Sequence, residues 1–179
     1  MQIINAFAAE LEAQTIPQLS QIAGVRWVSW DAPVHSTLCT TCIDTSKLAS
    51  AYISTVRADA VWNTSPYRQG QGIGVAVVDS GVNPQDDLYN VAGQSRLVAS
   101  VAFNNGYNAS TFDTFGHGSH VAGVIGGNGR KLAGTYIGVA PMVNIINVKV
   151  GDDLNKGQGT ASTVVAGLQW ILQNKKTYN

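Results

Sequence analysis

The stretch IGVAVVDSG, residues 73–81, decides the fold that this sequence predicts. Its first six residues are apolar without alternation, which is typical of a strand buried on both faces of a parallel sheet. Two similar apolar runs follow, at residues 96–103 (RLVASVAF) and 143–150 (VNIINVKV). A helical pattern over 117–127 lies between these two runs, and a longer one over 160–176 follows the last. Strands that alternate with helices indicate an α/β fold with a parallel sheet.

The composition indicates a globular chain and excludes several other classes. Lys+Arg and Asp+Glu each number 11 in 179 residues, so the formal net charge is zero, which argues against binding to nucleic acid or an anionic membrane. The apolar share of 45% argues against a disordered chain. No apolar run approaches the ~20 residues that span a bilayer. The start, MQIINAFAAELEAQ, has no basic region and no sustained apolar core, so we do not expect it to be a signal peptide.

The N-terminal part of the chain predicts a small strand–helix–strand module. Strands are expected over 3–11 and 25–30, with a helix capped by Thr15 between them. About 30 residues cannot bury a core of their own. Residues 34–55 are polar and without a clear period, which indicates a connector, and a short helix is expected over 58–62.

Two cysteines, Cys39 and Cys42, form a single CTTC in this connector. A zinc site usually needs a second pair of ligands at set spacing, and His35 alone is a weak addition. A redox CxxC normally opens a helix after a strand, which this one does not. We interpret the pair as two linker cysteines whose pairing the sequence leaves open.

Two residues in the second part of the chain are candidates for chemistry. Asp79 ends the first apolar run, and sites in parallel α/β sheets form outside the carboxyl ends of strands, although an Asp there also commonly forms a turn. His117 lies between Gly116 and Gly118 at the start of an expected helix. Imidazole is the side chain best suited to move protons near neutral pH. The pair therefore suggests acid–base chemistry at one edge of the sheet.

A metal site is the rival interpretation of the same residues. His117 and His120 are three positions apart and could bind a metal together with Asp79. The spacing lacks the Glu of an HExxH motif, however, and no third ligand is placed by the pattern. We therefore expect no metal here, and we interpret His120 as a buried core histidine.

Four collinear segments resemble motifs of the subtilisin-like serine proteases (subtilases, peptidase S8), and the resemblance covers residues 58–179. GIGVAVVDSGVNPQDDL resembles the segment of the catalytic aspartate, which places Asp79 at that position. DTFGHGSHVAGVIGG resembles the segment of the catalytic histidine, which places His117 there, with Ser119 instead of the commoner Thr. IGVAPMVNIINVKV and GQGTASTVVAGLQWI resemble the strand and helix that come next.

The resemblance implies three parts and a fold class. Residues 1–34 would be a partial α+β module, since AFAAELEAQTIPQLSQIAGVRWVSWDAPV is similar to the second half of the inhibitory propeptide of these enzymes. Residues 35–57 would be a connector, and residues 58–179 the N-terminal half of the catalytic domain. The expected fold is α/β, a partial subtilisin-like parallel sheet with flanking helices.

The implied activity is serine endopeptidase hydrolysis through an Asp–His–Ser triad. Asp79 and His117 fill two roles, but the G-T-S-M-A-x-P segment of the nucleophile and the asparagine of the oxyanion hole are absent. Ser162, in GTAS, follows Ala where the nucleophile should stand, so we reject it. The chain alone is therefore expected to be inactive. The alternative is a non-catalytic fragment or pseudoprotease that binds a partner.

The resemblance carries weaker implications as well. Asp113, four residues before His117, is expected to shape the substrate cleft or to brace its turn, and Asp87 is similar to a calcium-ligating aspartate of the family. No cofactor is required, and calcium is an option only for a longer parent. Peptides or proteins are the expected substrates, without nucleic acid or membrane partners. The resemblance implies export, although we expect no export signal in this chain. The strand that ends at Asp79 is expected to be left as an exposed apolar edge.

Overall fold

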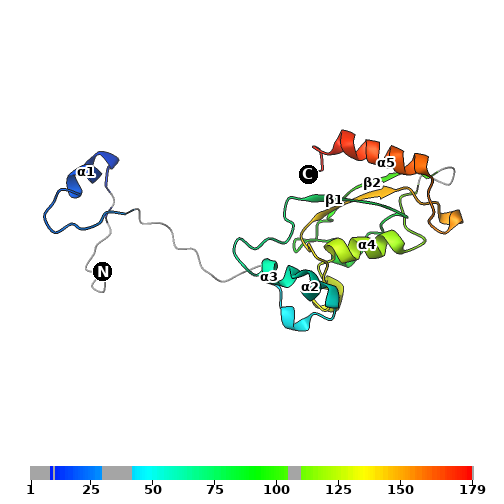
Figure 1. Ribbon diagram of the computed structural model, residues 1–179, viewed down its shortest axis with the longest axis horizontal. Helices are drawn as coiled ribbons and strands as arrows, with labels where there is room; N and C mark the ends of the chain where they lie inside the picture. Colours follow the sequence, from blue (N-terminus) through cyan, green and yellow to red (C-terminus); the bar gives the residue numbers. More distant parts are fainter. Residues whose placement is uncertain (1–8, 10, 30–41, 105–109, 179) are drawn as a thin grey trace. The chain divides into compact units, whose positions relative to one another are not determined.

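The computed structural model describes residues 9, 11–29, 42–104 and 110–178, and the chain divides into two units, residues 1–39 and 40–179 (Figure 1). The larger unit contains a three-stranded parallel sheet in the order β1-β3-β2. Its strands are β1 (Gly74–Asp79), β2 (Leu97–Ala102) and β3 (Asn144–Lys149). All three lie within the apolar runs that predicted them, so the predicted parallel sheet is confirmed.

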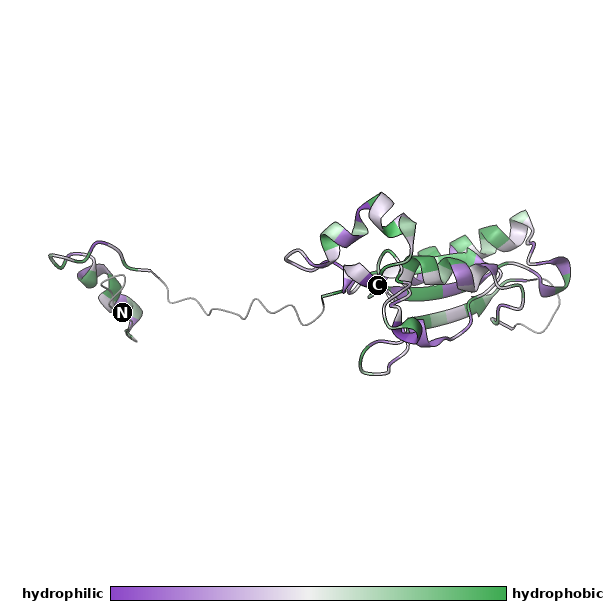
Figure 2. Cartoon of the chain, turned by 90° about the horizontal axis from the view of Figure 1, so that it is seen from below, coloured by the Kyte–Doolittle hydropathy of each residue, from purple (hydrophilic) through white to green (hydrophobic). Residues whose placement is uncertain are grey.

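The central strand β3 aligns the carboxyl ends of the other two. Asp79, the last residue of β1, is the register partner of Lys149, and Lys149 also pairs with Ala102 of β2. The strands are coloured mainly as hydrophobic in Figure 2, as expected for a sheet covered on both faces. Within the described residues β1 pairs with β3 alone, which makes β1 an edge of this sheet.

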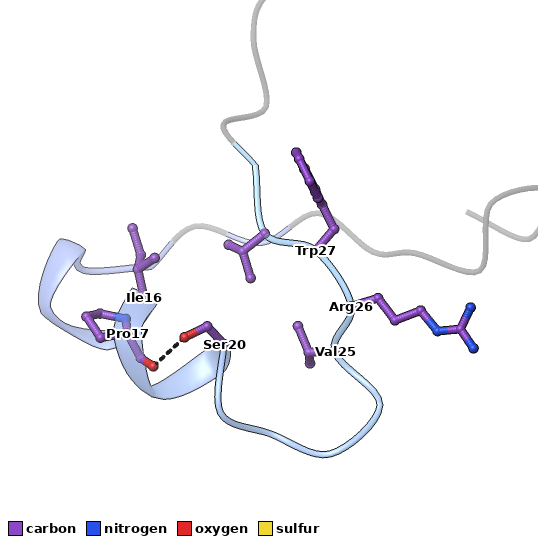
Figure 3. Close-up of a pocket in the computed structure, with 7 residues that line it drawn as sticks. Ile16, Pro17, Ser20, Val25, Arg26 and Trp27 are labelled. Atoms are coloured by element: carbon purple, nitrogen blue, oxygen red, sulfur yellow. Dashed lines mark hydrogen bonds between the residues drawn. The ribbon is translucent and has the colours of Figure 1, made fainter.

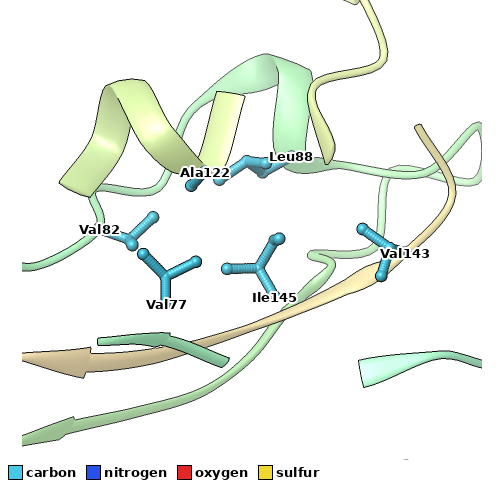
Figure 4. Close-up of a cluster of buried hydrophobic side chains, with 6 residues drawn as sticks. All are labelled: Val77, Val82, Leu88, Ala122, Val143 and Ile145. Carbon is cyan, nitrogen blue, oxygen red and sulfur yellow. The ribbon is translucent and has the colours of Figure 1, made fainter. Parts of the chain in front are cut away.

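Helix α4 (His117–Gly126) covers one face of the sheet. Its Ala122 packs into a cluster of buried side chains that includes Val77 of β1 and Ile145 of β3 (Figure 4). Side chains alternate between faces along a strand, so Val75, Val77 and Asp79 all lie on this α4 side. The alternation therefore directs the Asp79 carboxylate toward the helix that begins at His117.

Helix α5 (Ala161–Asn174) covers the opposite face, so the unit has three layers (Figure 1). Trp170 and Ile171 pack against a cluster formed by Ile146, Val148 and Val150. The helix begins with a capping box in which the Thr160 side chain accepts from the backbone of Thr163, and the Thr163 side chain accepts from that of Thr160. These helices confirm the predicted α/β class.

A helix that the sequence pattern did not predict, α2 (Ala51–Val56), lies in the stretch expected to be a connector. Together with α3 (Ala58–Trp62) it forms a second core cluster, in which Ile53 and Trp62 are almost completely buried beside Ile137. The Trp62 indole Nε1–H donates to the Val139 carbonyl oxygen at 2.9 Å. Because Ile53 is buried by residues distant in sequence, its local pattern gives little sign of a helix. The shorter 3₁₀ turns are η1 (Ala13–Thr15), η2 (Thr45–Lys47), η3 (Asp86–Leu88), η4 (Arg130–Leu132) and η5 (Asp153–Asn155).

The smaller unit differs from its prediction. Helix α1 (Ile16–Leu19) is present, but the Thr15 hydroxyl donates to the Glu12 carbonyl oxygen at 2.7 Å instead of capping it. Residues 25–29 form no strand, because a strand needs a neighbour to receive its backbone hydrogen bonds and no described residue of this unit provides one. The strand expected over 3–11 falls mostly outside the described residues.

An open groove of about 300 Å³ lies in this unit between α1 and residues 25–28 (Figure 3). Trp27, one of its lining residues, is 83% exposed, so this groove is not a packed core. Cys42 is disulfide-bonded, and Cys39 lies outside the described residues. Within the described ranges, none of the helices has the length and hydropathy that spanning a bilayer requires.

Candidate active site

Asp79 and His117 meet at the carboxyl end of β1. The His117 Nδ1 atom lies 2.8 Å from Asp79 Oδ1 and 2.9 Å from Oδ2, although 38 residues separate the two in the chain. The backbone N–H of Ser80 donates to the same Oδ1 at 2.7 Å. The carboxylate is therefore held from its own loop while it bonds the imidazole, and the two candidate residues are brought together as expected.

The Asp79 side chain is much less exposed to solvent than the His117 side chain. The Asp79 side chain is 20% exposed, whereas that of His117 is 59% exposed. Among the described residues, none bonds the second ring nitrogen, Nε2. One nitrogen of the imidazole therefore faces a carboxylate, and the other is available to an incoming group.

The carboxylate partner changes the acidity of the imidazole. The hydrogen bond to Asp79 raises the pKa of His117, and the negative charges of Asp79 and Asp113 raise it further, against a smaller opposing effect of desolvation. An acceptor carboxylate on Nδ1 also favours the tautomer that carries its proton on that atom. His117 is thus arranged as a base at Nε2 whose protonated form is stabilised.

The two positions that flank His117 each require glycine, for different physical reasons. Gly116, the N-cap of α4, has a φ of +94°, in the left-handed region that favours glycine. Gly118 is buried against Gly81 and Asp79, and no side chain fits there. The first turn of α4 therefore approaches the loop after β1 at backbone distance.

Asp113 lies inside the site and is only 5% exposed. Its Oδ1 accepts from the Gly116 N–H at 2.7 Å and from the Ser80 hydroxyl at 2.9 Å, and its Oδ2 accepts from the Ser119 N–H at 2.8 Å. Burial raises the pKa of Asp113, but these hydrogen bonds outweigh it, and the pKa is lowered from its usual value. Of the two expected roles, the contacts favour bracing the turn over lining the cleft.

Sequence reasoning did not single out four polar residues of this site, of which Asn83 is half-buried and the other three are buried. Ser80 and Asn83 follow β1, and Asn147 and Lys149 lie on β3. Asn147 Nδ2 donates to the Thr111 carbonyl oxygen at 2.9 Å, and Lys149 Nζ donates to that of Phe112. The available signal was the presence of Asn and Lys inside the apolar run VNIINVKV, at two positions that share one face of the strand.

The sequence suggests two metal alternatives, one at His117, His120 and Asp79 and one at Asp87. Within the described parts of the chain, no three His, Cys, Asp or Glu residues are grouped so that they could hold an ion, and this includes His117, His120 and Asp79. His120 is exposed, so its interpretation as a buried core histidine is wrong. Asp87 Oδ1 accepts from the Lys131 N–H at 2.7 Å, and the Arg96 guanidinium donates to the Asp87 carbonyl oxygen at 2.6 Å. Two oxygens of Asp87 therefore accept hydrogen bonds from other segments of the chain.

Ser162 lies at the exposed start of α5, the helix on the face opposite to α4. Its Oγ is 2.9 Å from the Oγ1 of Thr160, within the cap of that helix. No base among the described residues bonds it, as a nucleophilic hydroxyl would require. This agrees with its rejection from the sequence.

Comparison with known proteins gives one consistent result. The family model described as "Subtilase family" matches residues 70–179. Serine protease AprX of Bacillus subtilis (strain 168) is 33% identical over 172 residues, which are 95% of this chain and 34% of AprX. Subtilisin E of the same organism is 30% identical over 171 residues, 96% of this chain and 40% of that protein. Minor extracellular protease Epr, also of that organism, is 29% identical over 185 residues, 96% of this chain and 26% of Epr.

The chain thus spans between about a quarter and two fifths of the length of these curated relatives. Among solved structures, the CspB protease of Clostridium perfringens superposes with a TM-score of 0.57 at 21% sequence identity. The match covers 69% of this chain and 31% of that one. At this identity the likeness concerns the fold alone, a parallel sheet with helices on both faces.

Proposed function

Because this chain belongs to the subtilase family, we propose that Asp79 and His117 are the acid–base pair of an Asp–His–Ser triad that hydrolyses peptide bonds. The observation that carries the proposal is the bond of 2.8 Å between His117 Nδ1 and Asp79 Oδ1, with Nε2 on the open side. A paired Nδ1 and an accessible Nε2 are what a general base needs in order to take a proton from a hydroxyl.

The proposed reaction assigns each atom a task. Asp79 accepts the Nδ1–H of His117, holds that tautomer and stabilises the imidazolium. Nε2 takes the proton of a serine hydroxyl as that oxygen attacks the scissile carbonyl, and later gives it to the leaving amine. Backbone or amide N–H donors stabilise the oxyanion of the tetrahedral intermediate. No cofactor takes part in any of these steps.

The serine of this triad is not among the 179 residues, because they contain no G-T-S-M-A-x-P segment. The chain by itself is therefore proposed to be inactive as a peptidase. Peptides or proteins are the proposed substrates of the assembled site. Export is proposed by similarity to relatives such as Epr, whose name describes an extracellular protease.

A fluorophosphonate probe tests the proposal, since it reacts only with an activated serine. We expect no labelling of the chain alone. When it is co-expressed with the segment of Subtilisin E that carries the nucleophilic serine, we expect labelling of that serine. Asp79→Asn and His117→Gln should each slow labelling by about 10⁴-fold, the cost of removing one triad member. Asp86→Asn, which alters an exposed carboxylate on η3, is the matched control and should have no effect.

Two outcomes would contradict the proposal. Stoichiometric labelling of a serine of this chain would show that the nucleophile lies within it. Labelling of the complemented protein that survives His117→Gln would show that His117 is not the base.

A further inference from the structure

The first turn of α4 is capped from outside its own helix. The N-cap residue, Gly116, has no side chain to accept a hydrogen bond. The N–H of Gly118 donates instead to the Ser80 hydroxyl at 3.0 Å, and the N–H of Ser119 donates to Asp113 Oδ2 at 2.8 Å. The N–H groups of a first helical turn have no partner within the helix, and a negative charge beside them is favourable. Asp113 supplies that charge.

Asp113 is itself fixed by the loop that follows β1. The Ser80 hydroxyl donates to Asp113 Oδ1, and Asn83 bonds the Asp113 backbone twice. The Asn83 Oδ1 accepts from the Asp113 N–H at 2.8 Å, and the Asn83 Nδ2 donates to the Asp113 carbonyl oxygen at 2.7 Å. We call Ser80, Asn83 and Asp113 the clasp. The clasp joins the loop that follows Asp79 to the helix that begins at His117.

The clasp matters because His117 has little else to position it. Its side chain is 59% exposed, and its hydrogen-bond partner among the described residues is Asp79 alone. The place of the imidazole therefore depends on where the first turn of α4 is held. The place of the carboxylate depends on the Ser80 N–H, which donates to Asp79 Oδ1.

We propose that Asp113 is a positioning residue, which orients His117 toward Asp79 by holding the first turn of α4 against the loop after β1. The proposal rests on the proposed function, because it assigns Asp113 a task in the same acid–base pair. Asp113 does not touch the reacting atoms in this role; both of its carboxylate oxygens are used by Ser80, Gly116 and Ser119. Its charge also acts on the imidazole through space.

Nitrogen NMR of the imidazole in the full 179-residue chain tests this inference. Asp113→Asn removes the charge and replaces one acceptor oxygen with an NH₂ group, which cannot accept an N–H. We expect a lower pKa of His117 than in the unmodified chain and a loss of the Nδ1–H tautomer. Amide exchange at Ser119 should be faster by about tenfold or more, since a hydrogen bond to a charged group is lost. Asp86→Asn is the control and should change none of these.

Loss of the Asp113 charge by itself lowers the pKa of His117, so the tautomer of His117 is the deciding readout. A folded Asp113→Asn chain that keeps the Nδ1–H tautomer of His117 would therefore overturn the inference. If that variant does not fold, Ser80→Ala removes one hydroxyl of the clasp. We expect a smaller change in the same direction, and no change would likewise overturn the inference.

Asp79→Asn separates this inference from the proposed function. An unchanged imidazole in that variant would mean that Asp79 and His117 are not coupled, and the proposed function would fail. A changed imidazole in Asp79→Asn with none in Asp113→Asn would leave the proposed function standing and remove only the role of Asp113.

Discussion

Gly118, in the first turn of α4, lies so close to Gly81, in the loop after β1, that a Cβ on Gly118 would overlap the Gly81 carbonyl oxygen. The same Cβ would be 3.1 Å from the Cβ of Asp79. This close backbone approach brings the start of the helix over the end of the strand. It allows the short side chain of Asp79 to reach the imidazole of the neighbouring His117.

Gly118→Ala should therefore destabilise the protein and disturb the site. The added methyl group meets backbone atoms that cannot move away cheaply, and overpacking of this kind costs about 1–3 kcal/mol or more. Gly123→Ala is the matched control on the same helix, because its Cβ would meet no heavy atom within 4 Å. The control should gain up to about 1 kcal/mol from helix propensity. Urea denaturation measures both, and equal stabilities of the two variants would show that the close approach is absent.

The bond between His117 and Asp79 predicts a pH-dependent contribution to stability. The pKa of His117 is raised above its ordinary 6.5 by the hydrogen bond and the charge of Asp79. A raised pKa in the folded state means that the contribution is fully present below the ordinary pKa and is lost as the pH rises through the folded pKa. The stability difference between the unmodified chain and Asp79→Asn should thus be larger at about pH 6 than at about pH 9. A difference that is constant over this range would contradict the raised pKa.

Loss of Asp153, the ion-pair partner of Lys149, should lower the free energy of unfolding by a large amount. Its side chain is fully buried, and its Nζ bonds Asp153 Oδ1 at 2.6 Å. Asp153→Ala leaves this buried charge without its counter-ion, which typically costs about 3–5 kcal/mol. The double variant Lys149→Met with Asp153→Ala removes both charges and should recover most of the loss. Thermal and urea unfolding of the three chains would check this, and equal stabilities of single and double variants would show that the pairing contributes little.

Replacement of Arg96 should also lower the stability of the fold, independently of Lys149. Only 5% of Arg96 is exposed, and its guanidinium donates to the carbonyl oxygens of Val143, Gly126 and Asp87. Arg96→Met removes all three donors, and each buried acceptor without a partner costs about 1–3 kcal/mol. The exposed Arg68 offers a control, since Arg68→Met removes the same charge from the surface. Equal urea midpoints for the two variants would contradict the role of Arg96 in joining these segments.

The elements with strong patterns were predictable from the sequence, and those that depend on distant partners were not. A continuous apolar run marks β1, and a mainly apolar run marks β3, because both strands are covered on two faces. Helix α2 was missed because the burial of Ile53 comes from Trp62 and Ile137, which its local pattern does not reveal. The strand predicted over 25–30 is wrong for residues 25–29, since extended propensity alone forms no hydrogen bonds without a neighbouring strand.

The residues of the site also divide into those that the sequence pattern predicted and those that it did not. Asp79 and His117 were predicted as candidates because one is a carboxylate at the end of a buried strand, the other is an imidazole between glycines at a helix start, and both lie in segments that resemble subtilase motifs. Ser80, Asn83 and Lys149 were missed because their partners lie on other segments, and a polar residue in a sequence does not reveal what it will bond.

The sequence by itself determined the sheet, its two covering helices and the two candidate residues, Asp79 and His117. Periodic apolar residues, capping groups and glycines act over a few neighbouring positions, so their physical effects can be read in order along the chain. Only the tertiary structure decided that Asp113 faces inward, that Lys149 is buried with Asp153, and that the imidazole bonds its carboxylate across 38 residues. Those facts depend on which buried donor meets which acceptor once the strands and helices have packed, and packing joins residues that the sequence keeps far apart.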